Sequence, residues 1–232
     1  MASPTLRIAP SILAADFAAL GDAVRTVEEG GADLIHVDVM DGRFVPNVTI
    51  GIPVVAALNR VATVPLDVHL MMVEPERHLE NFVEAGASML SVHLEASPHL
   101  HRTLSVIRAL GATGGVALNP GTPPSSMASV ADQVDYVVVM SVNPGYSGQT
   151  FIPQSEEKVR EVRKLLDAAG NRAPIEVDGG VNFDNAAQLV TAGADILVAA
   201  SAIYGAADPT GATRRLRDAA LKGVPMATTE RD

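Results

Sequence analysis

The sequence predicts a single (β/α)8 (TIM) barrel, and three observations lead to this fold class. Short runs rich in β-branched residues recur eight times along the 232 residues, and segments with helical spacing separate them. The strings GGADLI, AGASML and AGADIL repeat one helix-stop, turn and strand-start pattern, which indicates a repeated βα unit. No strand is followed by G-x-G-x-x-G, so a doubly wound dinucleotide-binding sheet is disfavoured. Eight βα units in a chain of this length fit a closed barrel best.

The expected elements alternate from one end of the chain to the other. The eight expected strands are RIAPS from Arg7, LIHVDVM from Leu34, PLDVHLM from Pro65, MLSVHLE from Met89, GGVALN from Gly114, DYVVVMS from Asp135, PIEVDGG from Pro174 and DILVAAS from Asp195. Helical spacing is found, among other places, in Phe17 to Glu28, Pro75 to Ala85, Leu100 to Leu110, Glu156 to Ala168 and Phe183 to Ala192. Several of these segments end in Ala-Gly or Glu-Gly-Gly, which is typical of a helix C-terminus.

The chain reads as one domain over residues 1–232, because no internal linker separates the βα units. Only the ends, residues 1–4 and 223–232, are expected to be loose. The N-terminus has no basic region followed by a clean apolar run, and no apolar stretch reaches the ~18 residues of a membrane helix. A cytoplasmic location is the simplest expectation.

Composition excludes several classes of function. Seventeen basic and twenty-seven acidic residues give a net charge of −10, so nucleic acid and anionic membranes would be repelled, and neither is expected as a partner. The chain has no cysteine, which removes disulfides, thiolate metal sites and cysteine nucleophiles.

Polar side chains occupy one face of three expected strands. Alternate residues of a strand share a face, so His36 and Asp38 point to the same side, and His69 and Asp178 have the matching parity on their own strands. Buried strands of a parallel barrel are normally apolar on both faces. Since these residues lie near the carboxyl ends of the strands, where barrel enzymes keep their active sites, they predict a polar cluster at the barrel mouth.

These four residues offer two imidazole nitrogens and two carboxylates. Such a set suits Zn²⁺, Fe²⁺, Mn²⁺ or Co²⁺. One inward histidine is usually structural, but four such side chains from three strands favour a metal or catalytic site, since unpaired buried charge is costly. Further residues of the same inward parity are expected to orient the ligands, although for the histidine among them a hydrogen-bonded core role is an equal alternative: Asp67, Ser91, His93 and Glu176.

The three lysines, Lys158, Lys164 and Lys222, are not expected near the carboxyl end of any strand. This excludes Schiff-base chemistry and lysine-dependent decarboxylation, so acid–base work must fall to Asp, Glu or His. No G-x-S-x-G elbow is present, so acyl transfer is poorly supported.

Small residues follow the last three expected strands. The loop after the sixth is Asn143 to Gln149, Gly179-Gly180 follows the seventh, and the last strand ends Ala199-Ala200-Ser201. Such residues let backbone N–H groups approach an anion, and phosphate sites of these barrels lie near the loops after strands seven and eight. The sequence therefore predicts a barrel of the phosphate-binding type.

The chain resembles the ribulose-phosphate 3-epimerase family. The strings that carry the resemblance run from the first strand to the last and are APSILAADF from Ala9, HVDVMDGRFVPN from His36, DVHLMM from Asp67, MSVNPGYSGQTF from Met140 and EVDGGV from Glu176. The resemblance implies that His36, Asp38, His69 and Asp178 hold one divalent ion, with Zn²⁺ the first choice. It also implies that Asp38 and Asp178 exchange protons with the substrate.

The resemblance further implies a phosphorylated ketose as substrate and a homo-oligomer as the assembly. Ser11 and His69 would contact the sugar. Met40, Met71 and Met140 would line the pocket. The residues implied in phosphate binding are Gly145, Tyr146, Ser147, Gly148, Gly179, Gly180, Ala200 and Ser201. Ser147 and Ala200 each stand where the family usually has Gly.

Epimerisation next to a ketone requires removal of a proton from one face and its return to the other, through a 2,3-enediolate. Asp38 and Asp178, from strands two and seven, are expected on opposite sides of the substrate. Two alternatives remain: an epimerase for a six-carbon ketose 6-phosphate, and a non-catalytic sugar-phosphate-binding barrel. The paired aspartates disfavour the second, whereas the first shares the same motifs.

Overall fold

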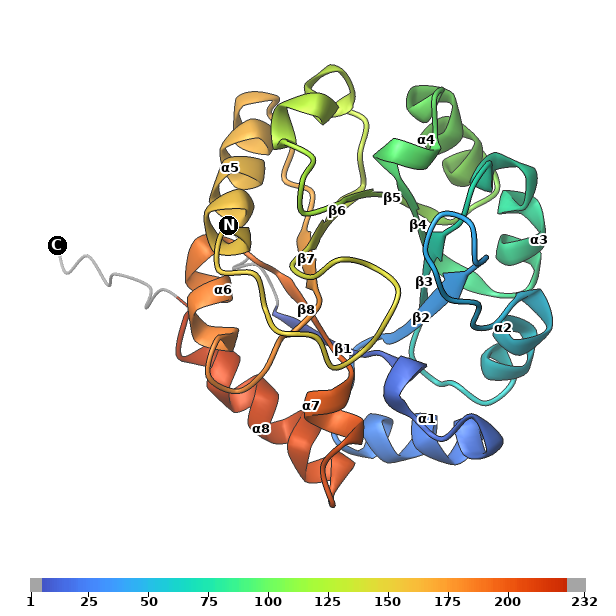
Figure 1. The fold of residues 1–232 in the computed structure, drawn as a ribbon, viewed down its shortest axis with the longest axis vertical. Helices are drawn as coiled ribbons and strands as arrows, with labels where there is room; N and C mark the ends of the chain where they lie inside the picture. The colour runs from blue at the N-terminus through green and yellow to red at the C-terminus, as the bar shows by residue number, and fades with distance from the viewer. Residues whose placement is uncertain (1–5, 225–232) are drawn as a thin grey trace, which may run out of the picture.

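Eight parallel strands form a ring in the computed structural model, which describes residues 6–224 (Figure 1). The strands are β1 (Arg7–Pro10), β2 (Ile35–Met40), β3 (Leu66–Met71), β4 (Ala87–His93), β5 (Thr113–Leu118), β6 (Tyr136–Met140), β7 (Ile175–Asp178) and β8 (Ile196–Ala199). Consecutive strands from β2 to β8 pair in parallel, and β8 pairs with β1. Between β1 and β2 the ring closes through a single parallel bridge between Ser11 and His36. The predicted barrel is confirmed.

Helices cover the outside of the ring (Figure 1). They are α1 (Leu20–Glu29), α2 (Ile52–Asn59), α3 (Leu79–Glu84), α4 (Leu100–Ala109), α5 (Ser155–Ala168), α6 (Ala186–Ala192), α7 (Ser201–Tyr204) and α8 (Pro209–Leu221). Short 3-10 helices are η1 (Ile12–Ala14), η2 (Phe17–Ala19), η3 (Pro75–Arg77), η4 (Leu94–Ala96) and η5 (Pro124–Val130).

The helices differ from the expected segments in three places. The segment expected from Phe17 begins as η2 and becomes α-helical only at Leu20. Helices α2, α7 and α8 were not among the expected segments. The crossover between β5 and β6 contains only η5, whose proline and serine residues at its start disfavour a regular α-helix.

Apolar residues fill two regions of the core. Residues of one strand parity pack outward against the helices, among them Val37, Val68 and Val177. The other parity points into the barrel, where Ala9, Tyr136 and other side chains form a separate cluster. The polar residues predicted to face inward share this second parity on β2, β3, β4 and β7, so the barrel interior holds both apolar and polar side chains.

The two ends of the chain lie mostly beyond what the structure describes. The expectation of loose termini concerns residues 1–4 and 223–232, of which only Gly223 and Val224 fall within residues 6–224. The hydroxyl of Thr191 donates to the carbonyl of Gly223 at 3.2 Å. Among the described helices, none combines the length and apolar character that crossing a bilayer requires.

A tight contact in the barrel interior yields a stability prediction. A Cβ atom added to Gly115 would lie 2.3 Å from Cζ of the fully buried Tyr136. We expect Gly115→Ala to lower the free energy of unfolding by about 1–3 kcal/mol, because the ring has no room to move. The neighbouring Gly114→Ala is the control, since its Cβ would meet Leu104 at 3.4 Å, close to ordinary contact. Urea unfolding checks this, and equal midpoints for the two variants would contradict it.

Candidate metal centre

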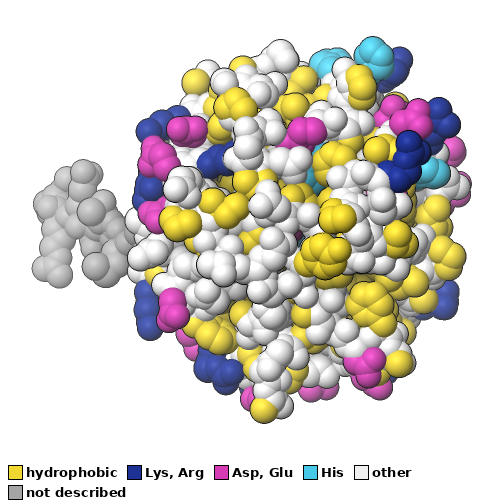
Figure 2. Space-filling view, viewed as in Figure 1, with side chains coloured by type: hydrophobic (Ala, Val, Ile, Leu, Met, Phe, Trp, Pro, Cys, Tyr) yellow, Lys and Arg dark blue, Asp and Glu magenta, His cyan; other side chains and the backbone are white. Residues whose placement is uncertain are grey.

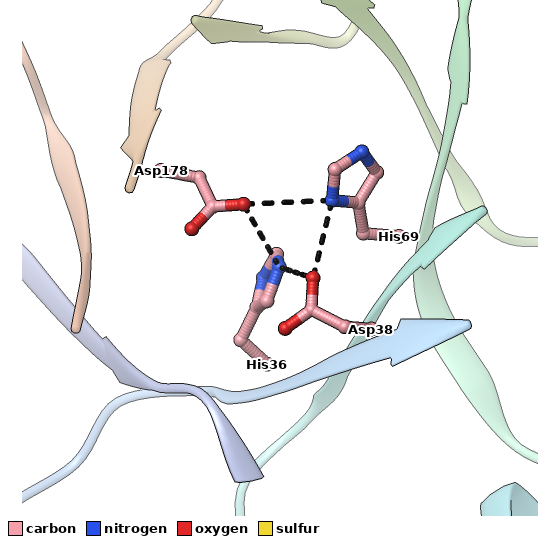
Figure 3. A group of neighbouring side chains, drawn as sticks. All are labelled: His36, Asp38, His69 and Asp178. Carbon is pink, nitrogen blue, oxygen red and sulfur yellow. Dashed lines mark ion pairs between the residues drawn. The ribbon is translucent and has the colours of Figure 1, made fainter. Parts of the chain in front are cut away.

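Four buried side chains converge at the mouth of the barrel (Figure 3). β2 supplies His36 and Asp38, β3 supplies His69, and β7 supplies Asp178. Oδ1 of Asp38 lies 3.4 Å from both His36 Nε2 and His69 Nδ1. Oδ2 of Asp178 lies 3.8 Å from His36 Nε2 and 3.6 Å from His69 Nδ1. The residues that the sequence predicts as one cluster are therefore brought together.

The spacing of these atoms fits a bound ion. His36 Nε2 and His69 Nδ1 are buried and have no hydrogen-bond partner among the described residues, although both face the carboxylates. Zinc binds nitrogen and oxygen at about 2.0–2.2 Å, so a tetrahedron of ligands has edges of about 3.3–3.6 Å. The four separations of 3.4–3.8 Å match these edges closely. The donor set suits a divalent transition metal.

The second ring nitrogen of His36 is held by a carboxylate. His36 Nδ1 lies 2.6 Å from Oδ2 of Asp67, and the Tyr136 hydroxyl donates to Oδ1 of Asp67 at 3.0 Å. A hydrogen on Nδ1 therefore leaves the lone pair of Nε2 directed at the centre, which is how carboxylates orient metal-binding histidines. Asp67 thus makes the contact with His36 that an orienting residue requires. Glu176 also lies near Nδ1, at 3.4 Å.

Electrostatics favour positive charge at the centre. Burial alone would lower the pKa of His36, but the carboxylates of Asp38 and Asp67 outweigh it and raise that pKa well above its usual value. For Asp38, burial opposes ionisation, yet the two histidines hold its pKa well below the usual range. Burial, followed by the charge of Asp67, raises the pKa of Glu176 well above its usual value. Burial and Asp67 thus favour the neutral form of Glu176, which carries no negative charge in the barrel.

Ser11 fixes the orientation of the Asp38 carboxylate. Its hydroxyl donates to Oδ2 of Asp38 at 2.5 Å, so Oδ1 is the oxygen that faces the histidines. The Ser11 oxygen also accepts the backbone N–H of Leu13 at 3.2 Å and caps η1. These two contacts hold the carboxylate in one orientation.

A pocket lies above the centre and opens at the mouth. His36 and His69 lie at its base, completely buried. The other predicted site residues all line the pocket: Ser11, Asp38, Met40, Met71, Met140, Gly145, Tyr146, Ser147, Gly148, Asp178, Gly179, Gly180, Ala200 and Ser201. No Lys or Arg is among the described residues that line it. Figure 2 shows the same distribution, with charged side chains at the rim of this face and uncharged atoms around its centre.

The loops after β7 and β8 require particular backbone conformations. Gly179 has φ of 113° and Gly180 has φ of 65°, and a Cβ on Gly180 would lie 2.7 Å from the backbone nitrogen of Phe151. Ala200 has φ of −101°, and Ser147 is not among the described residues with positive φ. A side chain at these two positions therefore causes no backbone strain, although the family usually has Gly there.

The segment between β6 and α5 crosses the opening of the barrel and is drawn in yellow in Figure 1. The side-chain amide of Asn47 donates to the carbonyl of Gly145 at 2.9 Å. The Tyr146 hydroxyl donates to the carbonyl of Pro46 at 3.4 Å. The loop after β2 thus holds the crossing segment over the pocket.

Two hydroxyl residues that the sequence analysis missed hold the strand ends that carry the aspartates. Thr49 Oγ1 donates to the carbonyl of Asp38 at 2.7 Å and accepts the N–H of Met40 at 3.1 Å. Ser141 Oγ donates to the carbonyls of Asp178 and Gly179 at 2.9 and 2.6 Å. Both hydroxyls follow strand ends in the sequence, but single Ser and Thr residues are too common there to be singled out.

His93 and Ser91, which were also expected to orient the ligands, differ in their contacts. His93 contacts His69 directly, with 2.9 Å between the two Nε2 atoms. Burial lowers the pKa of His93 to about 4, so its ring is neutral near pH 7. Ser91 Oγ, in contrast, has no hydrogen-bond partner among the described residues, so an orienting role for Ser91 is not supported.

The position of one lysine differs from the expectation. Lys158 Nζ donates to the carbonyls of Asn119 and Pro120 at 2.5 and 3.3 Å, directly after the carboxyl end of β5. The sequence could not show this, because the side chain reaches the loop from α5. The amine is held by these carbonyls and does not line the pocket, so it is not placed for Schiff-base chemistry.

Sequence comparisons identify relatives over nearly the whole chain. The model of the ribulose-phosphate 3 epimerase family matches residues 7–204. Ribulose-phosphate 3-epimerase of Bacillus subtilis is 52% identical over 213 residues, which are 91% of this chain and 98% of that protein. The chloroplastic ribulose-5-phosphate-3-epimerase of Arabidopsis thaliana is 53% identical over 212 residues, 90% of this chain and 75% of that protein.

Solved structures confirm the fold at much lower sequence identity. KGPDC from Streptococcus mutans superposes with a TM-score of 0.73 at 14% identity, covering 94% of this chain and 98% of that one. At this identity the likeness is one of fold alone.

Proposed function

The chain belongs to the ribulose-phosphate 3-epimerase family and interconverts D-ribulose 5-phosphate and D-xylulose 5-phosphate, and we propose that it does so with Asp38 and Asp178 as a pair of acid–base groups. The observation that carries this proposal is that the two carboxylates, from β2 and β7, face one pocket above a buried histidine pair. The paired carboxylates disfavour a binding protein without catalysis. The names of the relatives favour the five-carbon over the six-carbon substrate.

The two aspartates divide the proton transfers between the faces of C3. One carboxylate removes the C3 proton of one epimer, which gives the planar 2,3-enediolate, and the other returns a proton to the opposite face. In the reverse direction the roles exchange. The contact of Ser11 with Asp38 Oδ2 keeps that carboxylate in a single orientation during both steps.

We propose one divalent ion per chain, held by His36, Asp38, His69 and Asp178. Zn²⁺ is the first choice, and Fe²⁺, Mn²⁺ and Co²⁺ match the same donors. When bound, such an ion acts as a Lewis acid that stabilises the negative charge of the enediolate. Asp67 and His93 hold the two histidine rings in place from outside the group.

Three methionines provide the apolar walls of the reaction site. Met40, Met71 and Met140 are almost completely buried and line the pocket. Their polarizable side chains exclude water from the planar enediolate and so protect it from unwanted protonation. Ser11 and His69 are the proposed contacts of the sugar itself.

Backbone N–H groups form the proposed phosphate site. The amides of Gly180 and Ser201 donate to no other atom among the described residues, and both residues line the pocket. Gly145, Tyr146, Ser147 and Gly148 contribute from the segment that crosses the mouth. Backbone amides attract the phosphate locally, and the net charge of −10 repels it only at long range.

Assembly and location remain proposals. We propose that the enzyme works in the cytoplasm as a homo-oligomer, as the family resemblance implies. The exposed apolar side chains of Val48 and Tyr146, beside the mouth, are consistent with a subunit contact.

Removal of the metal tests the metal site. We expect a chelator to abolish turnover, and His36→Ala to lose the ion, because three remaining ligands bind a divalent ion more weakly than four. Elemental analysis of purified protein should give one ion per chain for the wild type. His101→Ala is the control, since His101 is exposed on α4. A fully active preparation free of metal would contradict the proposal.

Loss of the substrate phosphate tests the amide site. D-ribulose without its phosphate should be epimerised with a kcat/KM lower by about 10³-fold or more, because the binding energy of the remote phosphate is lost. Gly180→Ala should raise KM for the phosphate ester about 10-fold or more, because its Cβ pushes against Phe151.

The control for the second variant is Gly170→Ala. Gly170 has φ of 71°, so the substitution introduces similar backbone strain, but its Cβ would meet nothing within 4 Å and it does not line the pocket. Equal kcat/KM for D-ribulose and its phosphate ester would show that the amides do not bind phosphate.

Single substitutions of the aspartates test the two-base mechanism. Asp38→Asn and Asp178→Asn should each lower net epimerisation by ~10³-fold or more, since one face loses its proton carrier. The remaining carboxylate still exchanges the C3 proton of one epimer. In D₂O, one variant should therefore label mainly D-ribulose 5-phosphate and the other mainly D-xylulose 5-phosphate. Near-wild-type epimerisation by either variant, with its metal content verified, would rule out the mechanism.

A further inference from the structure

A chain of three side chains leads from the metal centre toward the surface. His69 Nε2 lies 2.9 Å from His93 Nε2, and the two rings are stacked with 26° between their planes. His93 Nδ1 lies 3.3 Å from Oε2 of Glu95. Both histidines are completely buried, whereas the Glu95 side chain, on η4, is 24% exposed. Glu95 is thus two contacts away from the centre and touches none of the four proposed ligands.

The contact between the two Nε2 atoms is a hydrogen bond with one donor and one acceptor. One of these nitrogens must donate a hydrogen and the other must accept it. If His69 donates, its Nδ1 is left with a lone pair, and the single ring hydrogen of a neutral His93 lies on Nδ1, where it can be donated to Glu95. If His93 donates instead, its bare Nδ1 lone pair faces the Glu95 carboxylate. Because a carboxylate only accepts hydrogen bonds, the first arrangement is favoured.

Glu95 is itself held in place. Its Oε1 accepts the backbone N–H of Asn119 at 2.9 Å and the hydroxyl of Thr122. Oε2 is therefore the oxygen left for His93. Lys158 adds to this arrangement, since its amine donates to the carbonyl of Asn119 and holds the same loop from the other side.

We infer that Glu95 is a positioning residue for the metal site: through His93 it places the ring hydrogen of His69 on Nε2 and so leaves Nδ1 free to bind the ion. This inference rests on the metal site of the proposed function. Asp67 does the same for His36 by direct contact, so both histidines of the centre have a carboxylate behind them, one direct and one relayed through a ring.

Glu95→Gln is the informative substitution. The oxygen of the new amide must occupy the Oε1 position, because the N–H of Asn119 and the hydroxyl of Thr122 both donate there. Its NH₂ group then faces His93 Nδ1 and favours a hydrogen on His93 Nε2. The hydrogens on His93 Nε2 and His69 Nε2 would then point at each other, so the variant disfavours the His69 tautomer that binds metal.

The first measurement is Zn²⁺ affinity, by competition with a chelating dye. We expect Glu95→Gln to weaken binding by about 10-fold or more, the range for partners of metal ligands. Glu28→Gln is the matched control: Glu28 Oε1 accepts the N–H groups of Thr63 and Val64, which a glutamine oxygen can keep, and no histidine contacts it. Thr122→Val tests a purely structural role, since it removes a bond that holds the loop but leaves the carboxylate.

The second measurement is the ¹⁵N spectrum of histidine-labelled, Zn²⁺-loaded wild-type protein, which needs no variant to fold. We expect His93 to carry its hydrogen on Nδ1 and His69 to carry its own on Nε2. A hydrogen on His93 Nε2 would overturn the inference, as would Zn²⁺ affinity of Glu95→Gln within twofold of the wild type, or an equal loss in Thr122→Val. These results leave the metal site itself intact, whereas a wild-type protein that binds no Zn²⁺ would overturn both.

Discussion

The barrel mouth is organised around buried negative charge. Asp38 and Asp67 lie in the barrel interior, and ionised carboxylates are costly there unless cationic partners or hydrogen-bond donors surround them. Two of the atoms that face away from the centre have partners of their own: Ser11 donates to Oδ2 of Asp38, and Asp67 contacts Nδ1 of His36. His36 Nε2 and His69 Nδ1 face the centre and have no such partner among the described residues, and this group of side chains could hold a cation.

Strand register sets the level of these side chains along the barrel axis. In the pairing of β2 with β3, Asp38 is opposite His69 and Met40 is opposite Met71, and in the pairing of β6 with β7, Met140 is opposite Asp178. Asp38 and His69 therefore lie at one level of the barrel, His36 and Asp67 lie at the level below it, and Met40 and Met71 lie at the next level toward the mouth. Register thus sets the level of each side chain, while the approach of Asp178 on β7 to Asp38 on β2 depends on closure of the ring, since these two strands do not pair.

The proposed phosphate site and the proposed metal site use different kinds of groups. The pocket has no basic side chain among its described lining residues, so the proposed phosphate site uses backbone amides at the ends of β7 and β8. Positively charged side chains lie at the rim of this face instead (Figure 2). This separation keeps lysine and arginine away from the aspartates, whose proposed role in proton transfer depends on a free carboxylate.

Local patterns determined most of what the sequence could show. Residue type and a period of two are local properties, so eight strands, their inward faces and the set His36, Asp38, His69 and Asp178 could all be recognised before the fold was known. The closure between β1 and β2, the 3-10 crossover η5 and the hydroxyl contacts of Thr49 and Ser141 could not. Neither could the contact between Lys158 and Asn119, or the one between Glu95 and Thr122. These features depend on which segments, distant in sequence, pack side by side, and that is decided only when the barrel closes.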